Sequence, residues 1–192
     1  MPRPTFRAVL LIDGYNMVGS WPDLKSARDR LGLEEARHQL IQLLLGYSVY
    51  QQYNTQIIFD AHYQGNPGSQ EQISPHVAIQ YTSYRQTADT YIEKTCAAFR
   101  HDLRRFEQRL IVATSDRAQQ LTVMGYNAEC MSAEKLLADI EAIARRVQRQ
   151  KSSAKTSSRR LLSSRLDPVA QAKLAKLRLG LPTDLPPQSQ RF

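Results

Sequence analysis

The sequence predicts an α/β fold with a central, mostly parallel sheet. Short apolar runs, such as AVLLI at residues 8–12 and LIVA at residues 110–113, alternate with longer segments of helical periodicity. Unbroken apolar runs of this length are typical of parallel strands, because helices cover both faces of such a sheet. Aspartates follow several of these runs, and an open α/β sheet places its functional crevice at the carboxyl ends of its strands.

The first half of the chain is expected to hold two strands, one long helix and two loops. Gly14 permits a tight turn directly after the strand at residues 8–12. Apolar side chains recur at helical spacing over residues 33–51 and predict a helix. The other expected elements are a polar surface loop over residues 20–32, a strand over residues 56–59, and a long loop rich in Gly, Pro and Asn over residues 61–75.

The second half alternates strands and helices more regularly. Gly125 is expected to end a short helix that starts at Asp116, and Ser132 is expected to cap the helix over residues 133–150. That helix carries its apolar side chains on one face. The other expected elements are strands over residues 76–81, 110–113 and 127–131 and a helix over residues 87–108.

Four aspartates are the best candidates for a functional site. Asp13, Asp60 and Asp116 each stand where an apolar run stops, and Asp89 opens a helical stretch after another strand-like run. The carboxyl ends of parallel strands meet at one edge of a sheet, so these side chains are expected to share a crevice. Carboxylates in one crevice repel each other unless a cation lies between them, which points to a divalent metal ion and phosphate chemistry.

Four further residues near these aspartates have both a functional and a structural interpretation. Asn16 could orient a water molecule or a phosphate, or form an Asx turn, and Ser115 could contact phosphate or serve only the local structure. Glu93 shares a helix face with Asp89, where it could join the site or only stabilise the helix start. His62 could assist proton transfer or lie solvated in the loop.

Composition points to a protein of a reducing compartment. The two cysteines, Cys96 and Cys130, lack metal-ligand spacing and are expected to be buried free thiols. No apolar stretch is long enough to cross a membrane, and because the first strand comes so early no leader sequence is expected. The expected location is the bacterial cytosol, or the plastid stroma if the protein is organellar.

Positive charge is concentrated in the last quarter of the chain. Residues 1–144 contain 14 Lys and Arg against 16 Asp and Glu, whereas residues 145–192 contain 12 against 2. This asymmetry suggests a polyanionic partner, most simply RNA, although a solvated tail would have the same composition. The basic residues expected to contact RNA are Arg145, Arg146, Arg149, Lys151, Lys155, Arg159 and Arg160.

The chain is expected to divide at about residue 150. Residues 1–150 hold the main domain, and residues 151–192 hold a Ser-rich basic linker to residue 164, a short amphipathic helix and a Pro-rich end. The sequence has no Walker A or GxGxxG motif, so no nucleotide cofactor is expected. It also lacks the GxSxG elbow of many acyl hydrolases, and DGYN lacks the second aspartate that an Asp-nucleophile phosphatase needs.

Four segments carry a family resemblance: LLIDGYNMVGSWPDL, FDAH, QTADTYIEK and VATSDRAQQ. They resemble the NYN domain of the YacP-like family, which belongs to the PIN-like nucleases. The resemblance runs from about Ala8 to Arg149, and the basic tail extends past it. The segment TADTYIEKTCAAFR is most similar to the cyanobacterial and plastid branch of the family.

The resemblance implies a three-layer α/β PIN-like fold and a ribonuclease that depends on Mg²⁺ or Mn²⁺. The acidic site of the family matches Asp13 of DGYN, Asp89 of TAD and Asp116 of TSD, with Asp60 and Asn16 at its near periphery. Such proteins are similar to ribosome-associated endoribonucleases that cut mRNA. The implied partners are therefore mRNA and the ribosome.

The sequence thus favours a metal-dependent endoribonuclease that acts on single-stranded RNA. Two alternatives stay open at this stage. A non-catalytic RNA- or ribosome-binding adaptor with the same fold would bind RNA without cutting it. A metal-dependent phosphatase would turn over a generic aryl phosphate.

Overall fold

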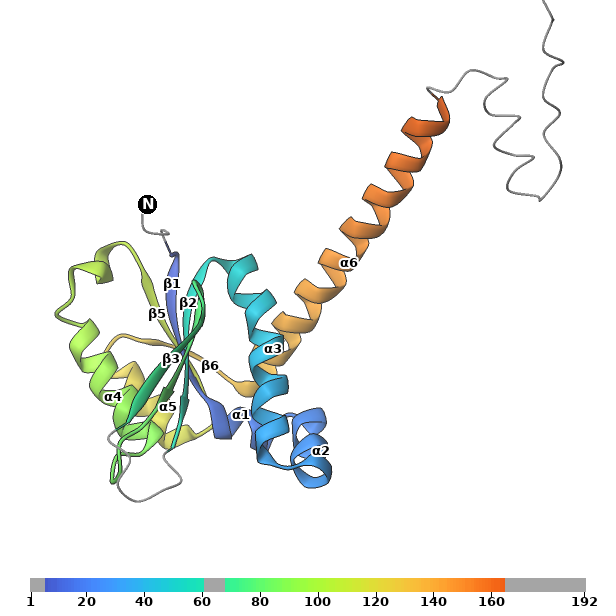
Figure 1. The fold of residues 1–192 in the computed structure, drawn as a ribbon. Helices are drawn as coiled ribbons and strands as arrows, with labels where there is room; N and C mark the ends of the chain where they lie inside the picture. Colours follow the sequence, from blue (N-terminus) through green and yellow to red (C-terminus); the bar gives the residue numbers. More distant parts are fainter. Residues whose placement is uncertain (1–5, 61–67, 165–192) are drawn as a thin grey trace, which may run out of the picture. The chain divides into compact units, whose positions relative to one another are not determined.

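The computed structural model describes residues 6–60 and 68–164, with side chains as far as residue 151. Figure 1 shows a twisted sheet with helices packed against it. The strands are β1 (Ala8–Asp13), β2 (Tyr53–Phe59), β3 (Ser69–Ser74), β4 (Val77–Tyr81), β5 (Arg109–Ala113) and β6 (Glu129–Met131). The helices are α1 (Gly14–Ser20), α2 (Pro22–Leu31), α3 (Leu33–Gln51), α4 (Ala88–Phe99), the 3₁₀ helix η1 (Leu103–Phe106), α5 (Arg117–Met124) and α6 (Ala133–Ser164).

The six strands form one sheet in the order β3-β4-β2-β1-β5-β6. Every neighbouring pair is parallel except β3 and β4, which are antiparallel. Strand β1 lies in the middle, with Ile12 opposite Ile57 of β2 and Ala113 of β5. The prediction of a mostly parallel α/β sheet is confirmed, and the parallel pairing brings the carboxyl ends of β1, β2, β4 and β5 to one edge.

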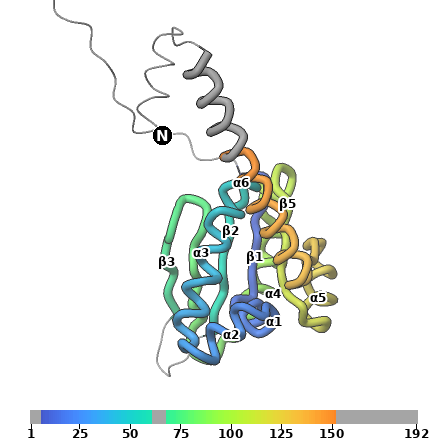
Figure 2. Tube along the Cα trace, turned by 90° about the vertical axis from the view of Figure 1, so that its right-hand side faces the viewer, coloured from blue at the N-terminus to red at the C-terminus, as the bar shows by residue number. Residues whose placement is uncertain are grey.

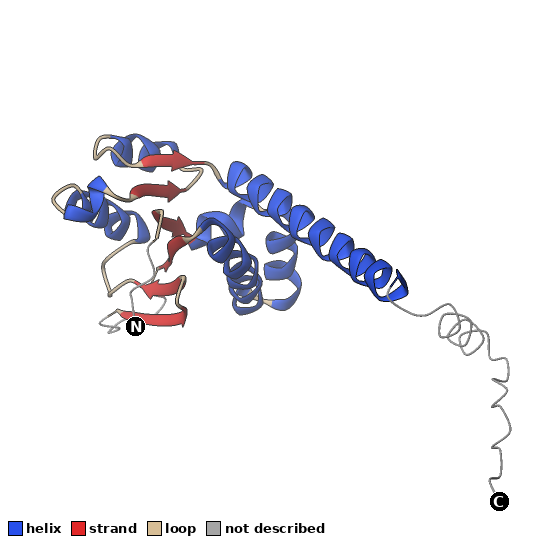
Figure 3. Ribbon diagram, turned by 90° about the horizontal axis from the view of Figure 1, so that it is seen from above, coloured by secondary structure: helices blue, strands red, loops and turns tan. Residues whose placement is uncertain are grey.

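Side chains of β1 alternate between two apolar cores. Leu10 and Ile12 face the core formed with α1, α2, α3 and the start of α6, whereas Val9 and Leu11 face the core formed with α4 and α5. Figure 3 shows helices on both sides of the strands, so the sheet is the middle of three layers. Each Leu or Ile buried in this way contributes about 1.5–3 kcal/mol.

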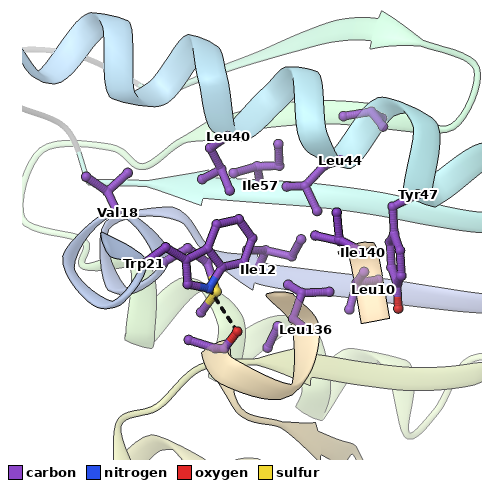
Figure 4. Close-up of a cluster of buried hydrophobic side chains, with 14 of the residues drawn as sticks. Leu10, Ile12, Val18, Trp21, Leu40, Leu44, Tyr47, Ile57, Leu136 and Ile140 are labelled. Carbon is purple, nitrogen blue, oxygen red and sulfur yellow. Dashed lines mark hydrogen bonds between the residues drawn. The ribbon is translucent and has the colours of Figure 1, made fainter. Parts of the chain in front are cut away.

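The prediction of a surface loop over residues 20–32 is wrong, because residues 22–31 form α2. Trp21 is only 2% exposed, and its indole N–H donates to the carbonyl oxygen of Ala133 over 2.8 Å (Figure 4). Pro22 occupies the first helical position, which suits its fixed backbone. Leu24 and Ala27 are the buried residues of α2. The other residues of the segment are mostly polar, which is why the sequence did not indicate a helix. Figure 2 shows α1 and α2 together at the end of β1.

Two further expected boundaries differ from the structure. Strand β3 lies within the expected long loop, and its polar residues are held by backbone pairing with β4 rather than by burial. The helix expected over residues 87–108 ends at Phe99. Asp102 then accepts a hydrogen bond from the backbone N–H of Arg104 and starts η1.

The basic linker expected over residues 151–164 is helical, because α6 runs without interruption to Ser164. No glycine or proline occurs between Ala133 and Ser164. Lys, Arg, Ala and Leu favour a helix, and serine disfavours it only slightly. Ser132 accepts a hydrogen bond from the backbone N–H of Lys135, as expected of the N-cap. Within residues 6–60 and 68–164, no helix is both long and apolar enough to cross a membrane.

Gly14 is required by packing rather than by turn geometry. The residue is helical and directly follows Asp13, so β1 passes into α1 without the expected turn. A Cβ atom at this position would lie 2.3 Å from Cε1 of Phe59, a fully buried side chain. The last residue of β2 and the start of α1 therefore touch, and only glycine leaves the required space.

We expect Gly14→Ala to lower the free energy of unfolding by about 1–3 kcal/mol, the usual cost of overpacking a core. Gly19→Ala in the same helix is the matched control, because nothing lies within 4 Å of its added Cβ. The control should stabilise the protein by up to about 1 kcal/mol, since alanine favours a helix. Urea unfolding followed by circular dichroism measures both. Equal effects of the two substitutions would contradict the packing role of Gly14.

Candidate functional site

The structure brings the four predicted aspartates to one edge of the sheet. Asp13 ends β1, Asp60 follows β2, Asp116 follows β5, and Asp89 lies in the first turn of α4. A hydrogen bond from the backbone N–H of Ala88 to Asp60 joins the end of β2 to the start of α4. The four aspartates therefore gather at this edge of the sheet from four separate chain segments.

Helix starts hold two of these carboxylates in place. Oδ1 of Asp13 accepts from the backbone N–H of Asn16 over 3.0 Å and caps α1. Oδ1 of Asp116 accepts from the N–H groups of Ala118 and Gln119 over 2.7 and 3.1 Å and caps α5. The exposed N–H groups of a helix start favour negative charge, so they offset part of the repulsion between the carboxylates.

The pKa values of two of these carboxyls are raised above their ordinary values. Burial raises the pKa of Asp13 to about 6, with smaller increases from the charges of Asp89 and Asp60, while the Asn16 N–H lowers it. Burial also raises the pKa of Asp89, followed by the charges of Asp116 and Asp60. Burial and, to a smaller extent, the neighbouring charges disfavour ionisation of these carboxyls, and a bound cation would offset both effects.

Asn16 and Ser115 join the strand ends that carry the site. The side-chain oxygen of Asn16 accepts from the backbone N–H of Ser115 over 2.8 Å, so it connects the end of β1 to the end of β5. The Ser115 hydroxyl accepts from the backbone N–H of Ala133 over 3.0 Å, where α6 begins. Both residues therefore have a structural task beside the cluster.

Glu93 lies apart from the aspartate cluster. Its carboxylate accepts a hydrogen bond from the Tyr126 hydroxyl over 3.2 Å, one turn further along α4 than Asp89. It is not among the charges that raise the pKa of Asp13 or Asp89. The remaining predicted site residue, His62, lies outside the described residues.

Gln119 is a site residue that sequence reasoning missed. Its side-chain N–H donates to Oδ1 of Asp89 over 2.5 Å, and its backbone N–H is bound by Asp116. The side chain is buried, and its Oε1 has no hydrogen-bond partner among the described residues. A glutamine three residues after an Asp N-cap matches a capping box, but that pattern predicts a bond back to the cap rather than to another helix.

The donor set is suited to a hard divalent cation, for which carboxylate oxygens are the usual ligands. The hydrogen bonds that Asp89 and Asp116 accept all end on Oδ1. Within the described part of the chain, Oδ2 of each carboxylate has no hydrogen-bond partner. No three His, Cys, Asp or Glu side chains of that part converge closely enough to enclose an ion by themselves. Mg²⁺ is commonly held by one or two carboxylates together with water and substrate phosphates, so the arrangement fits such an ion.

The predicted RNA-binding residues all lie on α6. Arg145 forms an exposed ion pair with Glu141 over 3.3 Å. Arg146, Arg149 and Lys151 are exposed, which leaves them accessible to a polyanion. The other three are within the helical backbone, but their side chains lie outside the description: Lys155, Arg159 and Arg160.

The two cysteines are free, as predicted. Cys96 is fully buried in α4, and burial raises the pKa of its thiol to about 12. Cys130 is only half-buried, so the expectation that it is buried is wrong. A buried thiol with such a high pKa is a poor nucleophile, so Cys96 serves the core rather than the chemistry.

The fold and the acidic edge define an α/β protein of the PIN-like nuclease class. The sequence model of the YacP-like NYN domain family matches residues 10–179, and the chain belongs to that family. NYN nuclease domains generally depend on divalent metal ions. The match extends past the expected limit near Arg149, so most of the basic tail is part of the family's pattern.

Relatives support the same assignment. A protein of Bacillus subtilis (strain 168), described as uncharacterized protein YacP, is 37% identical over 142 residues, which are 74% of this chain and 80% of that protein. The crystal structure of Rae1 (YacP) from Bacillus subtilis is similar with a TM-score of 0.62 and 34% identity, covering 90% of this chain and 95% of that one. A mutant of Rae1 has a TM-score of 0.64 and 31% identity, with 88% and 99% covered.

We expect the charge of Asp13 to cost stability near neutral pH. A carboxyl with a higher pKa in the folded state binds its proton more tightly when folded, so the free energy of unfolding falls as pH rises from about 4 to about 6. Asp13→Asn removes this loss. In the presence of a chelator the variant should be more stable than the unsubstituted protein by roughly 3 kcal/mol at neutral pH and similar at about pH 4.

Urea unfolding at a series of pH values measures this difference. Asp23→Asn on α2 is the control, because it removes an exposed carboxylate that is not part of the cluster. A constant difference between Asp13→Asn and the unsubstituted protein across the series would contradict the unfavourable burial of Asp13.

Proposed function

We propose that this protein is a divalent-metal-dependent endoribonuclease that cleaves single-stranded RNA. The observation that carries the proposal is the group of mutually repelling carboxylates at the carboxyl edge of the sheet, in a chain of a nuclease family. Asp13, Asp89 and Asp116 are the residues that would hold Mg²⁺ or Mn²⁺, together with water molecules and substrate phosphate. When bound, the ion would polarise a phosphate oxygen and lower the pKa of a bound water molecule.

The residues around the carboxylates would keep them in position. Gln119 orients Asp89 by a hydrogen bond, and the starts of α1 and α5 orient Asp13 and Asp116. Asn16 holds the ends of β1 and β5 together. Such preorganisation matters because phosphodiester cleavage depends mainly on positioning and on electrostatic stabilisation of the developing charge.

The substrate to test first is mRNA, free and bound to ribosomes. The aspartates repel RNA. We therefore assign the affinity for the RNA backbone to the basic residues of α6 and to the basic segment that follows. We place this activity in the cytosol, or in the plastid stroma for an organellar protein. Two free thiols and the absence of cysteine-rich motifs are compatible with those reducing compartments.

The doubly substituted protein Asp13→Asn, Asp89→Asn should lose cleavage of single-stranded RNA. Metal-ion catalysis is worth several kcal/mol and each 1.36 kcal/mol is tenfold, so we expect a loss of about 100-fold or more. Gel assays with end-labelled RNA in Mn²⁺ and in Mg²⁺ measure it. Asp23→Asn, Asp29→Asn on α2 removes the same charge and should retain activity.

Binding of the ion has a readout that does not need cleavage. Mn²⁺ should raise the melting temperature of the unsubstituted protein and leave that of Asp13→Asn, Asp89→Asn unchanged, because a ligand stabilises only the state that binds it. Unchanged cleavage by the double variant would overturn the proposed site. RNA binding without products under any metal would instead identify a non-catalytic adaptor, and turnover of aryl phosphate without RNA cleavage would identify a phosphatase.

Neutralising the basic residues of α6 should weaken RNA binding without changing the chemical step. Substituting Arg145, Arg146, Arg149 and Lys151 by Gln should raise KM and leave kcat nearly unchanged, since backbone contacts bind substrate and transition state alike. The dependence of log affinity on log salt should fall by about 0.7 for each lost phosphate contact. Titrations at several salt concentrations measure this slope, and an unaltered slope would remove α6 from the RNA interface.

A further inference from the structure

A pocket lies at the edge of the sheet opposite the aspartates. It encloses about 340 Å³ between the end of α4, η1, the first residue of β5 and the segment before β6. Figure 1 shows the connection between α4 and β5 at the end of the sheet away from α1. The pocket belongs to the same compact unit as the aspartates, residues 1–145, and none of the predicted site residues lines it.

The walls of this pocket combine aromatic rings with uncompensated positive charge. Among the described residues, no carboxylate pairs with Arg100 or Arg105, whereas Arg109 is neutralised by an ion pair with Glu129. The guanidinium of Arg105 lies 4.6 Å from the centre of the Phe106 ring and donates to the carbonyl oxygen of Arg100 over 2.6 Å. The Phe106 ring is 73% exposed, although a large apolar side chain gains by burial.

This chemistry matches a nucleotide of single-stranded RNA. Exposed aromatic rings stack on nucleobases, and arginine binds phosphate and also stacks on planar rings. An acidic peptide would use the arginines but would leave the exposed ring of Phe106 without a planar partner. The anionic substrate also needs contacts that lie away from the repelling aspartates.

We propose that this pocket is an RNA-binding site outside the cleavage site, in which Phe106 stacks on a base and Arg100 and Arg105 bind the adjoining phosphate. The inference rests on the proposed ribonuclease function. Strand β5 runs from the pocket toward Asp116 for five residues, or roughly 17 Å at 3.3 Å per residue, and ends three residues before Asp116. An RNA bound at both places would therefore span more than about five stacked nucleotides at roughly 3.4 Å each.

The chain offers matched controls on the same 3₁₀ helix. Arg104 adjoins Arg105 and carries the same charge, but it is held by Asp102 and does not line the pocket. Leu103 is as exposed as Phe106, at 82%, and also lies outside the pocket. Comparing Arg105→Ala with Arg104→Ala, and Phe106→Ala with Leu103→Ala, separates the pocket from general effects of charge or apolar surface.

The test measures the affinity of a fluorescent single-stranded RNA by anisotropy, with Asp13→Asn added to every protein so that the RNA stays intact. Loss of one stacked base weakens binding by about fivefold or more, so we expect that effect for Phe106→Ala and a comparable one for Arg105→Ala. Arg104→Ala and Leu103→Ala should bind within about twofold of their parent. In proteins that keep Asp13, Arg105→Ala should raise KM with little change in kcat.

Equal affinities within each matched pair would overturn this inference, even if the unsubstituted protein cuts RNA. Absence of both binding and cleavage in the unsubstituted protein would overturn the proposed function together with the pocket. Thermal unfolding checks that the variants are folded, and the exposure of Phe106 and Leu103 makes loss of the fold unexpected.

Discussion

Repulsion between carboxylates at one sheet edge is the constraint on which the rest of this site depends. Parallel pairing of β1, β2, β4 and β5 leaves no other place for residues that follow those strands. The protein offsets the repulsion by placing helix starts there: α1 binds Asp13, α5 binds Asp116, and the first N–H of α4 binds Asp60. Burial, and to a smaller extent the neighbouring charges, still raises the pKa values of Asp13 and Asp89, which leaves a cation a favourable addition.

The site is assembled by hydrogen bonds between residues far apart in the chain. Asn16 reaches Ser115 across the sheet edge, and Gln119 reaches Asp89 between α5 and α4. The Trp21 indole donates a hydrogen bond to Ala133 at the start of α6. These bonds make the carboxylate geometry a property of the packed domain. A nuclease built in this way needs a separate means of binding its polyanionic substrate, and positive charge is concentrated along α6 and around η1.

Prediction succeeded where local pattern and final environment agree. Strands β1 and β5 are buried on both faces, so their apolar runs were evident, and the aspartates that follow them had to reach the same edge. It failed for α2, whose stability comes from Leu24, Ala27 and the buried Trp21 rather than from a broad apolar face. It also failed for β3, because an edge strand held by backbone bonds has no hydrophobic period. Gly14 was recognised for the wrong reason, since its role depends on Phe59, which is distant in sequence.

The sequence by itself determined the fold class, the family and the identity of the acidic residues, because strand periodicity and strand-end motifs are local and depend on neighbours in the chain. Only the tertiary structure decided which groups act on one another. It separated Glu93 from Asp89 by pairing it with Tyr126, brought Gln119 into the cluster, and formed a cationic aromatic pocket from α4, η1 and β5. These contacts join segments that only packing brings together. Burial and charge are properties of the space around a side chain, and that space exists only after the layers have assembled.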